Sequence, residues 1–425
     1  MAKIQAIKGR EVLDSRGNPT VEAQVKVAGH WYRAIVPSGA STGKHEAVEL
    51  RDNNKKRYHG KGTLTAVQNI NMEISARLDG MKIGDPTDQR VIDDALIHLD
   101  ETYNKHVLGA NAMLAVSLAC ARAAAGQHKQ HLFSYLADVS KKSPFLLPVP
   151  QMNIINGGVH AGQKNDIQEH MIMPIGASSF KEGLRMGTEC YHALKELLHR
   201  KFKAQGTLVG DEGGFVPALK TVGERLALIE LAVENAGYRM KKDVVFALDI
   251  ASSEFFDGKE YTLSEKKYSA SGLLDYYKGL SKAYPIASIE DGFAEDDWGS
   301  WITFTKEMGK KMQIVGDDLL VTNPKRIEDA IKKRACNALL LKVNQIGTVT
   351  EALDAAKRAQ HNDWNVVVSH RSGETEDVFI ADLVVGINAG QSKFGAPTRS
   401  ERVAKYNQLL RIEEALGKKA KYGIR

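Results

Sequence analysis

The amino-acid sequence predicts an α/β protein in which a (β/α) barrel with an irregular start follows a smaller α+β domain. Between residues 244 and 395, short apolar runs alternate with helix-like segments; the runs are VVFALD, IASIED, QIVGDD, ALLLKV, NVVVSH and LVVGIN. Runs rich in Val, Ile and Leu without polar alternation are typical of strands buried on both faces of a parallel sheet. The chain has 425 residues, and a barrel commonly takes about 250, which leaves room for another domain.

The N-terminal part predicts the smaller domain. Residues 3–13, 20–27 and 30–36 are predicted strands of an antiparallel meander, with the turn formers Gly17, Asn18 and Pro19 between the first two. The pattern then becomes helical, with a helix start after Pro86 and an Ala-rich helix in GANAMLAVSLACARAAAG. Prolines in SKKSPFLLPVP stop helix formation. We therefore expect residues 1–139 to form the α+β domain and residues 140–425 the barrel.

The start of the predicted barrel is irregular. Residues 151–156 form its first predicted strand, and HMIMP follows as a second strand without an intervening helix. A long predicted helix leads to VGDEGGF, where glycines flank Asp211 and Glu212. Glycine lets the backbone bend sharply and approach a ligand, so we favour a functional acid pair there over surface acids. The chain ends in an amphipathic helix that stops at Gly417.

A charged or polar residue stands at or near the C-terminal end of five of the runs: Asp249, Glu290, Asp317, Lys342 and His370. In a closed barrel these ends converge on one mouth, where active sites are built. Any one of them alone would be interpreted as a polar residue that ends a strand, but five in register favour a site. Three carboxylates repel one another unless a cation lies among them, and an all-oxygen set suits Mg²⁺ better than zinc.

The Gly- and Ser-rich segment PSGASTGKHEA is not a nucleotide-binding P-loop. The spacing from Gly39 to Gly43 is one residue short, and His45 follows Lys44 where Ser or Thr is needed. On local evidence two interpretations stay open. The segment is either a loop that supplies a hydroxyl such as that of Ser41 to a metal or substrate, or a plain surface loop.

The composition is that of a soluble globular enzyme, with 43% hydrophobic and 26% charged residues. The formal net charge of +6 is mild, and no nucleic-acid motif accompanies it, which disfavours a nucleic-acid-binding function. Cys120, Cys190 and Cys336 lack metal or redox spacing and indicate reduced thiols. No signal core or bilayer-length apolar stretch is present, so we expect a cytoplasmic protein without membrane insertion.

Long motifs along the whole chain resemble those of the enolases: DSRGNPT, PSGASTG, NGGVHAG, QEHMIMP, VGDEGGF, ALDIASSEF, SIED, VGDDLLVTN, LLLKVNQIGT, SHRSGETED and GAPTRSERVAKYNQLLRIEE. The resemblance implies a glycolytic lyase, phosphopyruvate hydratase, which reversibly dehydrates 2-phospho-D-glycerate to phosphoenolpyruvate. It implies a (β/α)8-type barrel whose first units run ββαα, two Mg²⁺ ions, and a homodimer or, as in some bacteria, an octamer. Secondary roles of the family, in RNA-degrading assemblies or as a cell-surface or secreted plasminogen receptor, stay open.

The resemblance also implies roles for individual residues. Asp249, Glu290 and Asp317 would hold the tighter Mg²⁺, and Ser41 would ligate a second ion that arrives with substrate. Two further residues would transfer protons. Lys342 would remove the proton from C2, and Glu212, hydrogen-bonded to Glu169, would protonate the departing C3 hydroxide. The other residues implied in substrate binding are His160, Gln168, Glu169, His370, Arg371, Ser372 and Lys393.

Two alternative functions predict losses that this sequence does not show. Another acid/base enzyme of the superfamily should have lost the phosphate-side set His370, Arg371 and Ser372. A non-catalytic recruit would be free to lose Lys342 or Glu212. All five are present.

One position departs from the family pattern in a way that makes a prediction. Gly292 stands where the family generally has Pro. Because proline reduces the freedom of the unfolded chain, we expect Gly292→Pro to be tolerated and to stabilise by roughly 0.4 to 1 kcal/mol.

Overall fold

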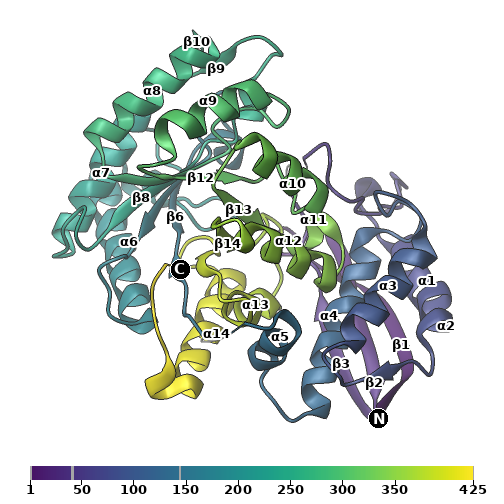
Figure 1. Cartoon of the computed structure of the whole chain (residues 1–425). Coiled ribbons are helices and arrows are strands. Elements are labelled where there is room, and N and C mark those ends of the chain that lie inside the picture. Colours follow the sequence, from purple (N-terminus) through teal and green to yellow (C-terminus); the bar gives the residue numbers. More distant parts are fainter. Residues whose placement is uncertain (1, 40–42, 143–144, 425) are drawn as a thin grey trace.

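The computed structural model describes residues 2–39, 43–142 and 145–424 (Figure 1). The N-terminal part contains a four-stranded sheet in the order β3-β2-β1-β4. All of its pairings are antiparallel, which confirms the predicted meander. Its strands are β1 (Ala2–Leu13), β2 (Pro19–Val27), β3 (His30–Ile35) and β4 (Lys82–Ile83).

Helices cover one side of this sheet. The Ala-rich helix α4 contacts β2 and β3, and nearly all of its residues are buried. Its small side chains let the helix lie close to the sheet. The helical elements of this part are η1 (Tyr58–Gly60), α1 (Leu64–Asn69), η2 (Ile70–Ile74), α2 (Ser75–Leu78), α3 (Asp88–Asp100), α4 (Ala110–Gln127) and α5 (Leu132–Ser140).

The second sheet curls into a nearly closed barrel. Its nine strands follow the order β5-β15-β14-β13-β12-β11-β8-β7-β6. The first and last strands in this order, β5 and β6, are separated only by Gln151 and so belong to one continuous segment. The backbone N–H of Gln151 donates to the Ser392 carbonyl at 2.7 Å. The strands are β5 (Val149–Pro150), β6 (Met152–Asn156), β7 (Glu169–Met173), β8 (Val245–Asp249), β11 (Ile286–Glu290), β12 (Gln313–Gly316), β13 (Ala338–Leu341), β14 (Asn365–Ser369) and β15 (Gly390–Lys393).

The start of the barrel has the expected ββαα order. A short 3-10 helix, η3 (Gly158–Ala161), lies between β6 and β7, and the helices α6 (Phe180–Phe202) and α7 (Val222–Asn235) precede β8. Strand β7 runs antiparallel to both β6 and β8, whereas the other barrel pairings are parallel. The sequence marks where these helices begin, because Ser179 accepts a hydrogen bond from the Glu182 N–H and Thr221 forms a capping box with Glu224.

The remaining elements surround the barrel, and α11 and α12 contact the helices of the N-terminal part (Figure 1). They are the helical elements η4 (Lys203–Thr207), η5 (Ser252–Phe255), α8 (Ala270–Ala283), α9 (Trp298–Met308), α10 (Pro324–Lys333), α11 (Val343–Ile346), α12 (Val349–His361), α13 (Phe379–Gly386), α14 (Ser400–Leu416) and η6 (Gly417–Lys419), and the hairpin β9 (Tyr261–Leu263) and β10 (Lys266–Tyr268).

The prediction for the last apolar run is wrong. LVVGIN belongs mostly to α13, and the last barrel strand is the polar sequence GQSK of β15. Every residue of α13 is buried, and an apolar run of this length has no periodicity that separates a buried helix from a buried strand. Strand β15 is polar because Gln391 joins an amide network with Gln151 and Gln313 inside the barrel.

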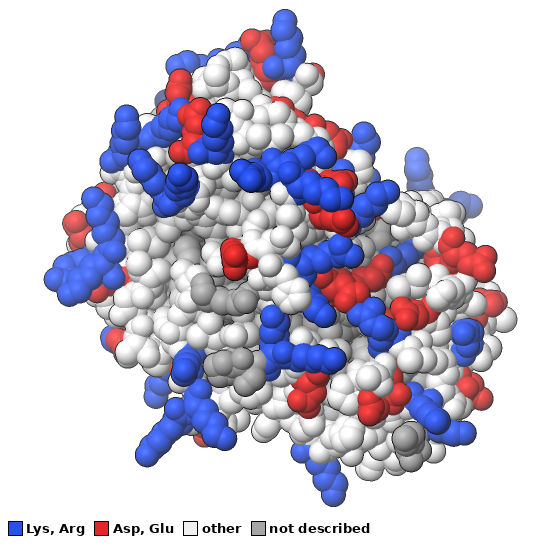
Figure 2. All heavy atoms as spheres, in the orientation of Figure 1, with Lys and Arg blue, Asp and Glu red and all other residues white. Residues whose placement is uncertain are grey.

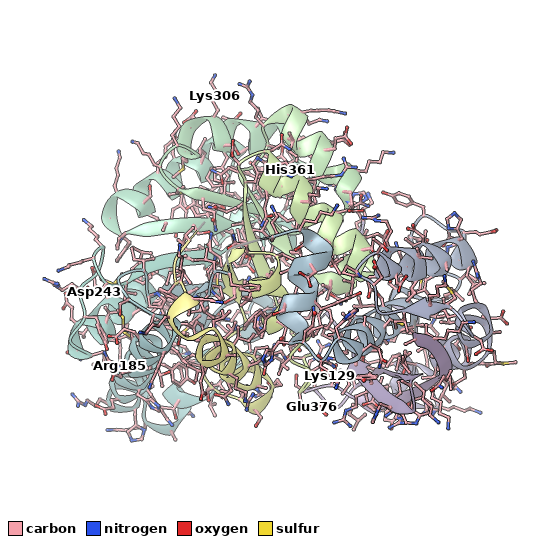
Figure 3. The ribbon with its side chains drawn as sticks, turned by 60° about the horizontal axis from the view of Figure 1, so that its bottom comes forward. Lys129, Arg185, Asp243, Lys306, His361 and Glu376 are labelled. Carbon is pink, nitrogen blue, oxygen red and sulfur yellow. The ribbon has the colours of Figure 1, made fainter. Side chains whose placement is uncertain are left out.

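Charged side chains of both signs are mixed over the surface in view (Figure 2). Figure 3 shows Lys306 and Arg185, both exposed, pointing away from the helices that carry them. Among the described residues, no helix combines the length and apolar character needed to span a membrane.

Gly292 lies where a side chain does not fit. A Cβ atom on Gly292 would lie 2.7 Å from Cε1 of Phe304, a fully buried ring that packs against Tyr277 and Phe293. Asp291, the preceding residue, has a φ of 45°, far from the extended conformation that a following proline favours. Both observations oppose the expectation that Gly292→Pro is tolerated.

We therefore predict that Gly292→Ala destabilises the protein by about 1 to 3 kcal/mol, because the new methyl group overpacks a rigid aromatic cluster. Chemical denaturation measures this loss. Gly279→Ala is the matched control, since Gly279 lies on the exposed side of α8 with open space around its Cβ position. That control should gain up to about 1 kcal/mol from helix propensity. Equal denaturation midpoints for Gly292→Ala and the unaltered protein would contradict the packing argument.

Candidate active site

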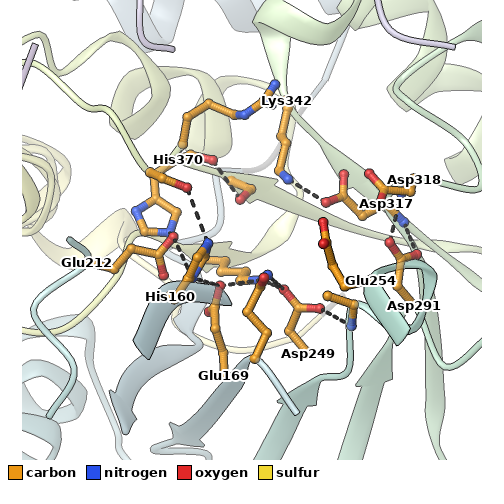
Figure 4. Close-up of a pocket in the computed structure, with 16 residues that line it drawn as sticks. His160, Glu169, Glu212, Asp249, Glu254, Asp291, Asp317, Asp318, Lys342 and His370 are labelled. Carbon is orange, nitrogen blue, oxygen red and sulfur yellow. Dashed lines mark hydrogen bonds and ion pairs between the residues drawn. The ribbon is translucent and has the colours of Figure 1, made fainter. Parts of the chain in front are cut away.

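The polar residues at the strand ends meet at one mouth of the barrel (Figure 4). Asp249 and Glu290 end β8 and β11 and stand opposite each other in the strand register. Glu169 also pairs with Asp249. Glu169 is the first residue of β7, and the antiparallel direction of that strand brings its beginning to the mouth where the other strands end. The fold thus gathers the predicted residues as a closed barrel should.

The cavity at this mouth is small, about 30 Å³, and its lining is almost entirely polar. Four larger hollows that described residues line lack this concentration of acids, lysines and histidines. The lining residues are His160, Gln168, Glu169, Glu212, Asp249, Ala251, Glu254, Asp291, Asp317, Asp318, Lys342, Ser369, His370, Arg371, Ser372 and Lys393.

Two lysines lie among the carboxylates. Lys393 Nζ lies 2.8 Å from Asp249 Oδ2, 2.9 Å from Glu290 Oε1 and 3.4 Å from Glu169 Oε1. Lys342 Nζ pairs with Asp317 Oδ2. Burial lowers the pKa of Lys393, but the surrounding carboxylates outweigh burial and hold that pKa well above its ordinary value. Burial and the neighbouring charge of Asp249 raise the pKa of Glu290 well above its ordinary value.

The carboxylates of the mouth could hold a metal ion. Glu290 Oε2 is buried without a hydrogen-bond partner, and the nearby donors are carboxylate oxygens, which suit a hard cation. Among the described residues, Asp291, Asp317 and Asp318 have ligand atoms within 4.8 Å of one another. In the predicted set, Lys393 donates to Asp249 and Glu290, and Lys342 donates to Asp317. Asp291 has a structural explanation, because its two oxygens accept the backbone N–H groups of Asp317 and Asp318 at 2.9 Å each.

A second group consists of Glu169, Glu212 and His160, whose ligand atoms also lie within 4.8 Å of one another. His160 Nδ1 is 3.7 Å from Glu169 Oε1 and 3.6 Å from Glu212 Oε1, and Asn153 donates to Glu212 Oε2 at 3.0 Å. The structure records no hydrogen bond between the two glutamates: Glu169 Oε2 has no partner, and Glu212 Oε2 accepts from Asn153.

The two glutamates of this group differ in pKa. Burial and the charge of Glu212 raise the pKa of Glu169 well above its usual range. Burial also raises the pKa of Glu212, but the combined effect of His160, His370 and Arg402 is larger and opposite. The pKa of Glu212 therefore falls well below its usual range. Two close carboxylates cannot both ionise readily, and the opposite directions of these shifts make Glu169 the harder of the two to ionise.

Arg402, which the sequence analysis did not single out, fixes the orientation of His370. Its Nη1 donates to His370 Nδ1 at 2.7 Å, which places the ring proton on Nε2, 3.6 Å from Glu212 Oε1. Arg402 also donates to the carbonyls of Asp211, Arg371 and Ser372. It lies in α14, far along the chain from the loops it joins, and its sequence context gives no local signal of this role.

The remaining predicted residues lie around the same cavity. Arg371 Nη1 donates to Glu46 Oε2 at 2.9 Å and to Asn344 Oδ1 at 3.0 Å. Ser372 Oγ lies 3.4 Å from His160 Nε2, and Gln168 Nε2 lies 3.4 Å from Asp249 Oδ2. The structure therefore brings together every described residue that the resemblance implied for the site. Asp211, predicted with Glu212 as a functional acid pair, is exposed and does not line the cavity; only its backbone carbonyl takes part, as an acceptor from Arg402.

Ser41 lies outside the described residues, so its predicted role as a metal ligand stays a prediction. The structure adds residues that the sequence analysis missed. Asp291 and Asp318 directly follow predicted ligands in SIED and VGDD, which is a signal that sequence reasoning could have used. Glu254 comes from the segment after β8, and Glu46 reaches the site from the N-terminal part.

Comparisons with known proteins agree with this architecture. Residues 4–136 match the family model of the enolase N-terminal domain, and residues 144–425 match that of the enolase C-terminal TIM barrel domain. The chain is also 55% identical to the enolase of Thermococcus gammatolerans over 416 residues, which span 97% of this chain and 95% of that protein. On its sequence and its fold, this chain belongs to the enolase family.

Proposed function

We propose that the barrel mouth carries out the enolase reaction, with Lys342 as the base at C2 and Glu212 as the acid at C3. As a member of the family, the chain is a carbon–oxygen lyase, the glycolytic phosphopyruvate hydratase that reversibly dehydrates 2-phospho-D-glycerate to phosphoenolpyruvate. One observation carries the assignment of roles. Lys342 and Glu212 approach the same cavity from different sides (Figure 4), an arrangement that allows one to take a proton from C2 while the other serves the hydroxide leaving C3.

Mg²⁺ is the proposed metal, in two ions. Asp249, Glu290 and Asp317 would hold the first, and Ser41 would ligate the second together with substrate. A bound Mg²⁺ would supply positive charge against the negative charge that develops beside the substrate carboxylate. Two features of these residues support a magnesium site: all of the donors are oxygens, and Glu290 Oε2 has no hydrogen-bond partner. A third is that the positively charged Nζ of Lys393 already lies between Asp249 and Glu290.

Lys342 has to be neutral before it can accept the C2 proton. Burial, the largest single influence, lowers its pKa, but the carboxylates around it, chiefly Asp317 and then Glu290, together leave that pKa above its ordinary value. Arg371 and Lys393 act in the opposite direction and favour the neutral amine. Weakening of the pair between Lys342 and Asp317 would therefore prepare the base.

The proton for the departing hydroxide comes from the other side of the cavity. The raised pKa of Glu169 favours its protonated form, and Glu212 lies beside it with His160 and His370 at 3.6 Å. We assign delivery to Glu212, with Glu169 as its proton source. Arg371 and Ser372 would bind the phosphate, and the other implied substrate-binding residues are His160, Gln168, His370 and Lys393.

The wider organisation also remains a proposal. The boundary between residues 139 and 140 falls in the stretch between the two family-model matches, which supports it. The homodimer or octamer and the cytoplasmic location rest on the family resemblance and on composition alone.

The activity itself is tested by following phosphoenolpyruvate formation from 2-phosphoglycerate. We expect turnover with Mg²⁺, loss of turnover when a chelator removes the ion, and recovery when Mg²⁺ is restored. Undiminished turnover in the chelator, or no turnover with Mg²⁺, would refute the proposal.

The metal site is tested by Asp317→Ala. Removing one carboxylate from the set should weaken Mg²⁺ binding in calorimetry roughly tenfold or more, and turnover should fall with it. Asp275→Ala removes the same charge from α8, where the side chain is 74% exposed, and should leave Mg²⁺ affinity unchanged. Equal affinities in both variants would place the ion elsewhere.

Arg402→Lys tests the link between α14 and the catalytic loops. Lysine keeps the charge but cannot bond His370 and the three loop carbonyls together, so we expect a loss of about 2 kcal/mol or more in unfolding free energy and a lower kcat. Arg399→Lys, at a neighbouring side chain that is 33% exposed, should change neither quantity much. A wild-type kcat in Arg402→Lys would show that Arg402 is not needed to orient His370 and the loops for catalysis.

A further inference from the structure

Two buried polar side chains beside the mouth, Thr322 and Gln345, have no part in the chemistry described so far. Thr322 is fully buried, and Gln345 is 1% exposed. Thr322 follows β12 in the turn after Asp317, and Gln345 lies in α11, directly after Lys342. Thr322 and Gln345 thus lie beside Asp317, a proposed metal ligand, and Lys342, the proposed base.

The turn that carries Thr322 has an unfavourable backbone. Val321 and Thr322 have φ values of 43° and 53°, although both are β-branched residues, for which positive φ is a genuine outlier. Such conformations persist where surrounding structure imposes them, and they concentrate at functional sites. Here the conformation places the Thr322 hydroxyl between Lys342 and Gln345.

Donor and acceptor roles run in one direction along this contact. The backbone N–H of Lys342 donates to Thr322 Oγ1 at 2.9 Å, and an N–H can only donate. The Thr322 hydroxyl then donates its own hydrogen to Gln345 Oε1 at 2.8 Å, because its other acceptor, the Leu340 carbonyl, lies 3.5 Å away. The orientation of the Gln345 amide follows, with Nε2 turned away from Thr322.

Gln345 Nε2 reaches Asp317. It donates to Asp317 Oδ1 at 2.8 Å, while Asp317 Oδ2 pairs with Lys342 Nζ. The chain of hydrogen bonds thus starts at the backbone of Lys342 and ends on the carboxylate that meets the side chain of Lys342. One oxygen of Asp317 is occupied by a neutral amide, and the other faces the mouth.

The same amide lies close to the phosphate side of the site. Gln345 Nε2 is 3.4 Å from Glu46 Oε1, and Glu46 also accepts from Nη1 and Nη2 of Arg371 at 2.9 and 3.2 Å. A guanidinium carries five donors, so a carboxylate on one edge is compatible with an anion on another. Gln345 therefore contacts both the proposed metal carboxylate and the carboxylate that holds Arg371.

We propose that Thr322 and Gln345 are positioning residues that set which oxygen of Asp317 is offered to the metal and to Lys342. The proposal rests on the proposed function, because it needs Asp317 to be a metal ligand. Partners of this kind, behind the ligands themselves, orient the ligating oxygen and commonly change metal affinity on removal. A purely structural pair would affect stability without affecting the metal.

The experiment compares three threonine variants by Mg²⁺ calorimetry without substrate, together with thermal melts. Thr322→Val keeps the shape and removes the hydroxyl, and it should weaken Mg²⁺ binding about tenfold or more. Thr322→Ser keeps the hydroxyl and should retain the affinity of the unaltered protein. Thr20→Val is the matched control, since Thr20 is 1% exposed and its hydroxyl donates to the Val36 carbonyl at 2.7 Å within the N-terminal part. It should lower the melting temperature without changing Mg²⁺ affinity.

Unchanged Mg²⁺ affinity in Thr322→Val would overturn the positioning role, as would equal weakening in Thr322→Ser, because the effect would then not depend on the hydroxyl. If Thr322→Val does not fold, Gln345→Met decides instead, since it keeps an unbranched side chain of similar length and loses both amide donors. Weaker binding there supports the proposal, and unchanged binding overturns it. The proposed function would fail separately, through an unaltered protein that neither binds Mg²⁺ nor turns over 2-phosphoglycerate.

Discussion

The structure depends on keeping several like charges together at a narrow, largely buried mouth of the barrel. Asp249, Glu290, Asp317, Glu169 and Glu212 are each at most 7% exposed and line or adjoin one small cavity. Burial makes every one of these charges costly, and their proximity adds repulsion. The buried Lys393 and the partly buried Lys342 offset part of that repulsion, and bound Mg²⁺ is the further positive charge that the proposed function adds.

The elements outside the barrel hold this arrangement in place. α14 supplies Arg402, which joins His370 to the loops of Glu212 and Ser372. The N-terminal part meets the same mouth through the bridge between Ser38 and Gly373, and it is tied to the barrel by the pair of Arg122 with Asp377 at 2.7 Å. The N-terminal part thus supports the site from outside the cavity, through Ser38 against Gly373 and through Glu46, which accepts from Arg371.

Much of this arrangement follows from sequence because strand periodicity and strand ends are local signals. Buried apolar runs marked five parallel strands, and the polar residue after each run marked the mouth, so Lys342 and Asp317 were found together. The same logic failed for LVVGIN and missed β15, since an apolar run can be a buried helix and a strand that carries Gln391 and Lys393 does not look apolar. The roles of Arg402, Thr322 and Gln345 could not be predicted from the sequence for another reason. Their roles come from contacts between distant segments and from a backbone conformation that local propensity opposes.

The central claim is that Lys342 and Glu212 act on different bonds at different moments, and hydrogen exchange at C2 tests it most directly. With 2-phosphoglycerate and Mg²⁺ in D₂O, Glu212→Gln should form no phosphoenolpyruvate yet still take deuterium into C2, because a stabilised intermediate can revert before the hydroxide leaves. Lys342→Ala should lose both product formation and exchange. Retained exchange in Lys342→Ala together with lost exchange in Glu212→Gln would contradict the account and interchange the base and the acid.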